Sequence, residues 1–159
     1  MNKISKLVIC VVGCELAGIL GTIFTAPAIS GWYSTLVKPV FNPPSYIFAP
    51  VWTILYFMMG VSLYLVLVKK GKAKAKDKEK AINFFYTQLA LNIAWSILFF
   101  GLHDPLLALI DIVFLWGFIM LTIFKFHLID KTASLLLFPY LWWVSFAAVL
   151  NYSIWFLNR

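Results

Sequence analysis

The stretch WYSTLVKPVFNPPSYIFAPVWTILY, residues 32–56, separates two long apolar segments and contains seven aromatic residues and four prolines. Proline fixes φ and removes a backbone hydrogen-bond donor, so this stretch cannot form one regular helix. We expect a short, stiff connection that leads into a membrane helix, whose first turns carry Trp52 and Tyr56.

The composition around this stretch is that of a membrane protein. The chain is 63% hydrophobic and 12% charged, about half of the roughly 25% charged residues of soluble proteins. Residues 81–102 and 132–158 carry no charge, and residues 105–124 carry only Asp111. Each run is long enough to span a bilayer, which takes about 20 apolar residues. We therefore predict an all-α integral membrane protein, a bundle of five transmembrane helices.

The apolar runs and their boundaries divide the chain into five spans within a single domain, residues 1–159. Asp104 and Pro105 are typical of an N-cap followed by proline at the first helical position. Asn42 or Ser45 could cap the second span, and Pro50 predicts a kink or an opened turn beyond its first turn. The basic segment 69–80 is expected to be a solvated loop. The predicted helices cover about residues 7–28, 45–68, 81–102, 105–124 and 133–156.

The lysines lie between the spans and predict how the chain is oriented. With five spans, eleven lysines fall on the side of the N-terminus, whereas Lys38 and Arg159 fall on the other side. This bias predicts a cytoplasmic N-terminus and a C-terminus outside. The net charge of +7 does not indicate nucleic-acid binding, because the basic residues do not form one polar face.

The first span has a basic start, like a signal peptide, but it stays apolar for a dozen residues after Glu15, too long for a cleaved segment. Gly13, Ala17 and Gly21 form a small-residue face that could pack inside the bundle or against a second subunit of a homodimer. Cys10 and Cys14 lie one helical turn apart, a poor geometry for a disulfide, and are interpreted as buried thiols. No metal site is predicted, because the two histidines lie in distant predicted loops.

Two acidic residues lie inside predicted spans. Carboxylates are costly in a bilayer and often mark function, but a neutral carboxyl could equally serve as a structural hydrogen-bonding group. Both interpretations stay open for Asp111, and Glu15 lies nearer to a helix end.

Tryptophans and amides share helix faces in two spans, and Trp52 and Tyr56 lie on one side of the second span. On the third span Gln88, Asn92, Trp95 and Phe99 lie on one face. On the fifth span, Trp143 shares a face with Ala147, Leu150 and Asn151, whereas Trp142 points about 100° away. These faces fit either core packing with an interfacial aromatic belt or a cavity for a flat, mostly apolar ligand.

Motifs of common enzyme classes are absent from the sequence. There is no phosphate-binding loop, no HExxH, no GxSxG and no cooperating Ser/His/Asp set. A conventional hydrolase or metalloenzyme is therefore not expected.

At the level of motifs, the chain resembles the translocator protein family, also called tryptophan-rich sensory proteins or TspO. The resemblance rests on residues 32–56, on QLALNIAWSILFFG at 88–101, on the segment around Asp111 and on PYLWWVSFAAVLNYSIW at 139–155. It covers nearly the whole chain in the right order. It implies a five-helix bundle, often dimeric, with a pocket beneath the connection between the first two helices.

The resemblance also implies ligands. Members bind protoporphyrin IX and related tetrapyrroles, as well as isoquinoline carboxamide and benzodiazepine-type compounds, so we expect a tetrapyrrole ligand and no required cofactor. Trp52 and Asn92 would donate hydrogen bonds to a ligand carbonyl or carboxylate. The ligand-binding residues that the motifs carry over are Tyr33, Pro43, Pro44, Trp52, Asn92, Trp95, Asp111, Trp143, Ala147 and Leu150.

Animal members also bind cholesterol, but the sequence argues against a sterol here. Their motif needs a basic residue within five intervening positions after its tyrosine, and six residues separate Tyr152 from Arg159. The lysine-rich loop suits a bacterial cell membrane.

The leading functional hypothesis is a membrane protein that binds tetrapyrroles and senses or handles porphyrin under stress. One alternative is an enzyme that degrades porphyrin with light and oxygen, in which Trp52 and Trp143 would be the catalytic residues. A second alternative is a transporter of porphyrin or other small amphiphiles, although no inverted repeat is evident.

Overall fold

In the computed structural model of the chain, residues 2–70 and 75–159 are described, and within them the chain is helical and has no strand. Five helical segments there are long and apolar enough to cross a membrane, which confirms the predicted five-helix membrane bundle. The elements are α1 (Lys3–Ser30), α2 (Trp32–Thr35), η1 (Ser45–Ile47), α3 (Phe48–Val68), α4 (Ala75–Ser96), η2 (Ile97–Gly101), α5 (Pro105–Ile129), α6 (Lys131–Leu135) and α7 (Phe138–Leu157).

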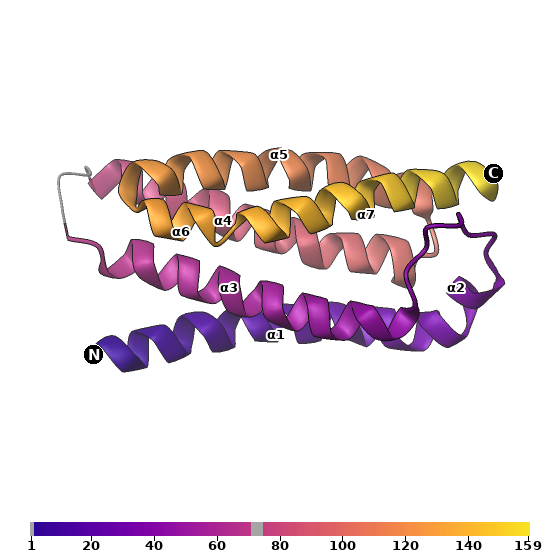
Figure 1. Cartoon of the computed structure of the whole chain (residues 1–159), viewed down its shortest axis with the longest axis horizontal. Helices are drawn as coiled ribbons and strands as arrows, with labels where there is room; N and C mark the ends of the chain where they lie inside the picture. The colour runs from indigo at the N-terminus through magenta and orange to yellow at the C-terminus, as the bar shows by residue number, and fades with distance from the viewer. Residues whose placement is uncertain (1, 71–74) are drawn as a thin grey trace.

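The long helices run side by side, and their ends gather into two opposite groups (Figure 1). The start of α1, the end of α3 and the start of α4 lie at one end, whereas α2 and the C-terminus lie at the other. Helix α1 packs along α3, and α5 packs against both α4 and α7. Of the basic residues that the sequence assigns to one side, those in the described part of the chain therefore lie in or beside the helix ends at one end of the bundle.

Several helices extend beyond their predicted bounds. Helix α4 begins at Ala75, so the second half of the basic segment is helical rather than loop, and residues 71–74 lie outside the described residues. Helix α5 continues to Ile129, so Lys125 and His127 are helical and not in a loop as predicted. No glycine or proline interrupts the sequence between Phe124 and Ile129, which explains the extension.

The predicted fifth helix is divided into α6 and α7. Pro139 stands in the first turn of α7, and a proline in mid-helix would clash with the carbonyl four residues earlier, that of Leu135. Asp130 accepts a hydrogen bond from the backbone N–H of Ala133 at 3.0 Å and so caps α6.

The fourth span begins with a side-chain cap, whereas the second span does not. The Asp104 carboxylate accepts hydrogen bonds from the N–H groups of Leu106 and Leu107, both at 3.0 Å, which confirms the predicted cap. Neither Asn42 nor Ser45 caps α3, which follows the 3-10 turn η1. Because α3 begins only at Phe48, Pro50 falls in its first turn, where a missing N–H has no intrahelical partner to lose.

The third span ends in a π-helical turn, η2, which the sequence did not predict. The N–H of Leu102 donates to the carbonyl of Ile97 at 2.8 Å, five residues back. This turn buries the adjacent residues Phe99 and Phe100 together, and both pack against Tyr33. Turns of this kind are rare and often occur at functional sites.

Part of the small-residue face of α1 is buried inside the bundle. Ala17 and Gly21 are buried in the bundle, whereas a Cβ on Gly13 would meet nothing within 4 Å. The predicted small-residue face is thus used inside the bundle at two of its three positions. Cys10 and Cys14 are buried free thiols, as interpreted from the sequence.

The half of the bundle nearer the N-terminus has a tightly packed core. Met59, Phe85 and Phe126 are fully buried there, and the rings of the two phenylalanines stack at 5.7 Å. The half nearer the C-terminus is built from tryptophans and amides, and it contains the cavity.

Candidate functional site

A cavity of about 250 Å³ lies in the half of the bundle nearer the C-terminus. Its walls come from α1, α3, α4 with η2, and α7, and Tyr33 of α2 and Ser45 of η1 contribute at the end of the bundle. Helix α3 faces α7 across aromatic rings, which leaves space between the helices.

The structure brings together most, but not all, of the expected site residues. The lining contains Tyr33, Trp52, Asn92, Trp95, Trp143, Ala147 and Leu150. Pro43, Pro44 and Asp111 do not line the cavity.

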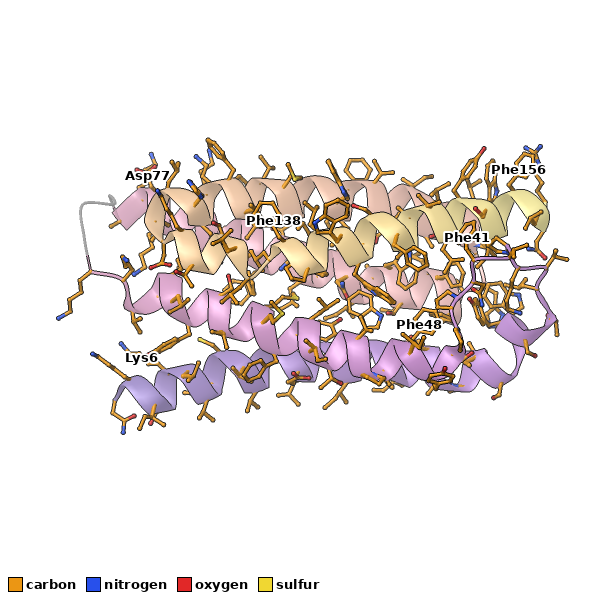
Figure 2. The ribbon with its side chains drawn as sticks, viewed as in Figure 1. Lys6, Phe41, Phe48, Asp77, Phe138 and Phe156 are labelled. Carbon is orange, nitrogen blue, oxygen red and sulfur yellow. The ribbon has the colours of Figure 1, made fainter. Side chains whose placement is uncertain are left out.

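Aromatic rings from α3, α4 with η2, and α7 form one side of the cavity, opposite small and aliphatic residues of α1. The rings of Trp52 and Trp143 lie 6.5 Å apart and nearly perpendicular, at 89°. Phe48 packs edge-on against Trp143 at 6.2 Å, and Trp95 stacks on Phe99 at 5.2 Å. Figure 2 places Phe48 and Phe41 in the half of the bundle that ends near Phe156. Such walls favour a flat, apolar ligand.

The amide of Asn92 joins three helices beside the cavity. Its Oδ1 accepts a hydrogen bond from the hydroxyl of Tyr56 at 2.5 Å, and its Nδ2 donates to the hydroxyl of Tyr140 at 2.9 Å. Asn92 therefore has one N–H left for a ligand, and much of its role is to hold α3, α4 and α7 together.

A second amide fixes Trp95. The indole N–H of Trp95 donates to Oδ1 of Asn151 at 3.0 Å, and Nδ2 of Asn151 donates to the carbonyl of Pro105 at 2.7 Å. These bonds use the polar group of Trp95, so this ring offers the ligand only its apolar surface.

Two indole groups remain available for a ligand. Within the described part of the chain, neither Trp52 nor Trp143 donates its N–H to an acceptor. Among the lining residues Glu15 is the one with a formal charge at neutral pH, and none of them is Lys or Arg. The cavity thus combines aromatic walls with free indole donors and a carboxyl group.

Tyr33 connects the cavity to the segment between α2 and η1. Its hydroxyl donates to Oδ1 of Asn42 at 2.6 Å, and the ammonium of Lys38 lies 4.9 Å from its ring centroid. Burial raises the pKa of Tyr33 to about 12, and the hydrogen bond with Asn42 partly offsets that rise. The hydroxyl is therefore protonated, and so a donor, at neutral pH.

The expected residues outside the cavity have other surroundings. Pro43 and Pro44 lie just before η1, where Pro44 is extended at ψ 139° and directs the chain into the 3-10 turn. Asp111 is 9% exposed on α5, and its Oδ2 has no hydrogen-bond partner among the described residues. Gln88 is buried, and neither of its side-chain polar atoms has a hydrogen-bond partner among the described residues. It does not line the cavity.

Sequence reasoning missed the lining residues Phe48 and Phe146. Phe48 lies four residues before Trp52, and Phe146 lies three after Trp143. Extending the helical spacing of three and four residues from each tryptophan would have found both of them.

Comparisons with known proteins identify the family of the chain. The TspO/MBR family matches residues 10–156. The chain is 48% identical to the Tryptophan-rich protein TspO of Chlorobaculum tepidum, covering 99% of both chains. It is 44% identical to the Tryptophan-rich protein TspO of Archaeoglobus fulgidus, covering 98% of this chain and 99% of the relative.

An animal protein is similar over most of its length as well. The Translocator protein of Bos taurus is 38% identical, with 89% of this chain and 83% of the relative covered. The five membrane-spanning helices, the aromatic cavity and these similarities lead to one conclusion: the chain is an integral membrane protein that belongs to the TspO/MBR family.

Proposed function

We propose that this membrane protein binds a tetrapyrrole, with protoporphyrin IX as the reference ligand, and thereby senses or handles porphyrin under stress. The observation that carries the proposal is the group of three tryptophans, from α3, α4 and α7, around one cavity. Trp52 and Trp143 line it, and their indole N–H groups have no acceptor among the described residues, so the site combines flat apolar surfaces with donors for polar ligand atoms.

The charges of the lining favour one orientation of such a ligand. Because the lining contains Glu15 and no Lys or Arg, buried propionate groups would lack a partner there. The macrocycle therefore lies among the tryptophans, and its carboxylates point to the end of the bundle where Lys38 lies. The names of two relatives, a Translocator protein and a Tryptophan-rich sensory protein, are compatible with a role in sensing or moving a small molecule.

We further propose that the N-terminus faces the cytoplasm of a bacterial cell and that the C-terminus lies outside. The support is the gathering of basic residues at the end of the bundle that holds the N-terminus.

The binding proposal is tested by titrating purified protein with protoporphyrin IX in the dark and following the porphyrin absorption band. Trp52→Phe keeps an aromatic ring but removes the free N–H, so we expect roughly 3- to 10-fold weaker binding, the value of one hydrogen bond. Trp142→Phe is the matched control, because Trp142 is 74% exposed and lies outside the lining. Equal binding by both variants, or no saturable binding by the wild type, would contradict the proposal.

A second candidate function is light-dependent oxidation of the bound porphyrin. The perpendicular Trp52–Trp143 pair favours it, because two oxidisable indoles 6.5 Å apart line the same cavity. Illuminating the titrated samples in the presence of oxygen tests it. Trp143→Phe should then bind porphyrin but yield less product than Trp142→Phe, and equal product from both would exclude a role for this pair.

A further inference from the structure

Glu15 is a cavity residue in the middle of a membrane-spanning helix. The sequence placed it nearer to a helix end, but α1 begins at Lys3 and ends at Ser30, so Glu15 lies close to the middle. A carboxylate at such a depth is costly, because the bilayer does not solvate it. Ionisable residues there usually pair with a partner or mark the place where a substrate or an ion binds.

The chain itself supplies no partner for this carboxyl group. Within residues 2–70 and 75–159 the side chain of Glu15 makes no hydrogen bond and no ion pair, and the salt bridge found there joins Lys69 to Asp130. The cavity lining contains neither Lys nor Arg. A positive charge that pairs with Glu15 in the cavity would therefore come from a ligand.

Aromatic rings surround the end of the cavity where Glu15 lies. The lining residues of α1, α3 and α4 farthest from the C-terminal end of the bundle are Glu15, Tyr56 and Asn92. The carboxyl group lies close enough to the hydroxyl of Tyr56 to interact with it electrostatically, but this hydroxyl donates its hydrogen bond to Asn92. The ring of Tyr56 lies 5.6 Å from that of Trp52. Because the faces of such rings attract cations, they favour the same charge as the carboxylate does.

The cavity is open between α1 and α3. Lining residues of both helices are exposed there, namely Ile19 and Thr22 on α1 and Thr53 on α3. Their exposed neighbours Ile23 and Ile54 are apolar, so a ligand that uses this opening comes from the bilayer and needs an apolar body. The volume of about 250 Å³ is below the roughly 300–1,000 Å³ of sites for drug-sized ligands, and it suits a small molecule.

We propose that the cavity binds a small apolar cation, an amine or a quaternary ammonium compound, with the carboxylate of Glu15 as its counter-ion and the rings of Tyr56 and Trp52 beside the charge. This inference goes beyond tetrapyrrole binding and does not depend on it. A porphyrin carries carboxylates, which Glu15 repels, whereas Glu15 attracts a cation. The residue thus discriminates between ligands by the sign of their charge.

The test uses two probes of the same shape, benzyltrimethylammonium and its uncharged carbon analogue neopentylbenzene, titrated calorimetrically into purified protein in one non-ionic detergent. Glu15→Gln removes the charge and nearly keeps the size of the side chain. We expect it to weaken binding of the cation by roughly 10- to 100-fold and to leave the Kd of the uncharged probe unchanged. Glu79→Gln is the matched control, because the exposed Glu79 lies on α4 outside the lining, and it should bind both probes as wild type does.

Glu15→Asp keeps the charge on a shorter side chain, so it should bind the cation more tightly than Glu15→Gln does. Equal cation binding by wild type and Glu15→Gln, or no saturable cation binding by wild type, overturns the inference. Equal weakening of both probes also overturns it, because Glu15 would then only support the shape of the cavity. Titration with protoporphyrin IX decides the proposed function separately: wild type that binds the cation but not the porphyrin supports this inference and contradicts that function.

Discussion

Gly60 and Gly117 both stand inside long membrane helices, yet a methyl group would meet very different surroundings at the two positions. At Gly60 an added Cβ would lie 2.5 Å from Cα of Val11 and 2.9 Å from the carbonyl oxygen of Cys10. Both atoms belong to the backbone of α1 and cannot rotate away. At Gly117 it would meet nothing within 4 Å. The first glycine therefore sets the distance between α1 and α3.

We expect Gly60→Ala to lower the free energy of unfolding by about 1–3 kcal/mol, the usual effect of overpacking. Gly117→Ala should instead be neutral or stabilising by up to about 1 kcal/mol, because alanine favours the helix more than glycine does. Thermal unfolding of both variants in one detergent measures the difference. An equal shift in Tm would mean that the close approach of α1 and α3 does not contribute to stability.

Residue identity was also a guide to the site, but it did not reveal the hydrogen bonds that a site residue makes with other helices. The sequence pointed to Asn92 as a ligand donor, but the structure commits most of its amide to Tyr56 and Tyr140. The pairing depends on two tyrosines from other helices, at sequence separations of 36 and 48. No local pattern around Asn92 contains that information.

At the junction of α5 and α6, one side chain supplies hydrogen bonds that the helix ends lack. Asp130 ends the long α5 and caps α6, and it also accepts a hydrogen bond from the ammonium of Lys69 at 2.8 Å. The hydrogen bond from Lys69 holds the pKa of Asp130 below its ordinary value of 3.8, with smaller help from backbone N–H groups and in spite of some burial. Asp130 thus connects the end of α3 to the start of α6.

This ion pair predicts a pH dependence. Because the pKa of Asp130 is lower in the folded chain, its stabilising effect is fully present above pH 3.8 and is lost as the pH falls through the folded-state value. Lys69 is half exposed, so the contribution is at most about 1 kcal/mol. We expect Lys69→Met to lower the Tm at pH 7 relative to the exposed control Lys70→Met, and the difference to vanish in acid. A difference that persists below the pKa would point to another role of Lys69.

At the scale of the whole molecule, the bundle has two chemically different ends. Lysines at the start of α1, just after α3 and at the start of α4 share one end, and among the described residues Lys38 and Arg159 are the basic residues of the other. Exposed residues between these ends are apolar, such as Ile23, Ile54 and Val113, each more than half exposed. A bilayer covers such a surface, and the charge difference orients the bundle in it.

The orientation is tested with single cysteines in a background that lacks Cys10 and Cys14. A membrane-impermeant maleimide added to intact cells should label Arg159→Cys, whereas Lys3→Cys should react only after lysis, because we propose that the N-terminus is cytoplasmic. Labelling of Lys3→Cys in intact cells, with Arg159→Cys protected, would show the opposite orientation.

The sequence by itself determined the class of the protein, the number of spans, the cap at Asp104 and seven of the ten expected site residues that line the cavity. These features depend on local properties: the hydropathy of about 20 residues, a short capping motif, or spacings of three and four on one helix. For the same reason the family motifs were recognisable within single segments.

Only the tertiary structure decided the π-turn at η2, the position of Asp111 outside the cavity and the pairing of Asn158 with Val37. Each depends on which helices become neighbours. The π-turn buries Phe99 and Phe100 against Tyr33 of another element, and Asp111 lies on α5, which does not contribute to the lining. Such outcomes arise from packing between distant segments, where the free energy of burial outweighs local preference, so no single stretch of the sequence contains them.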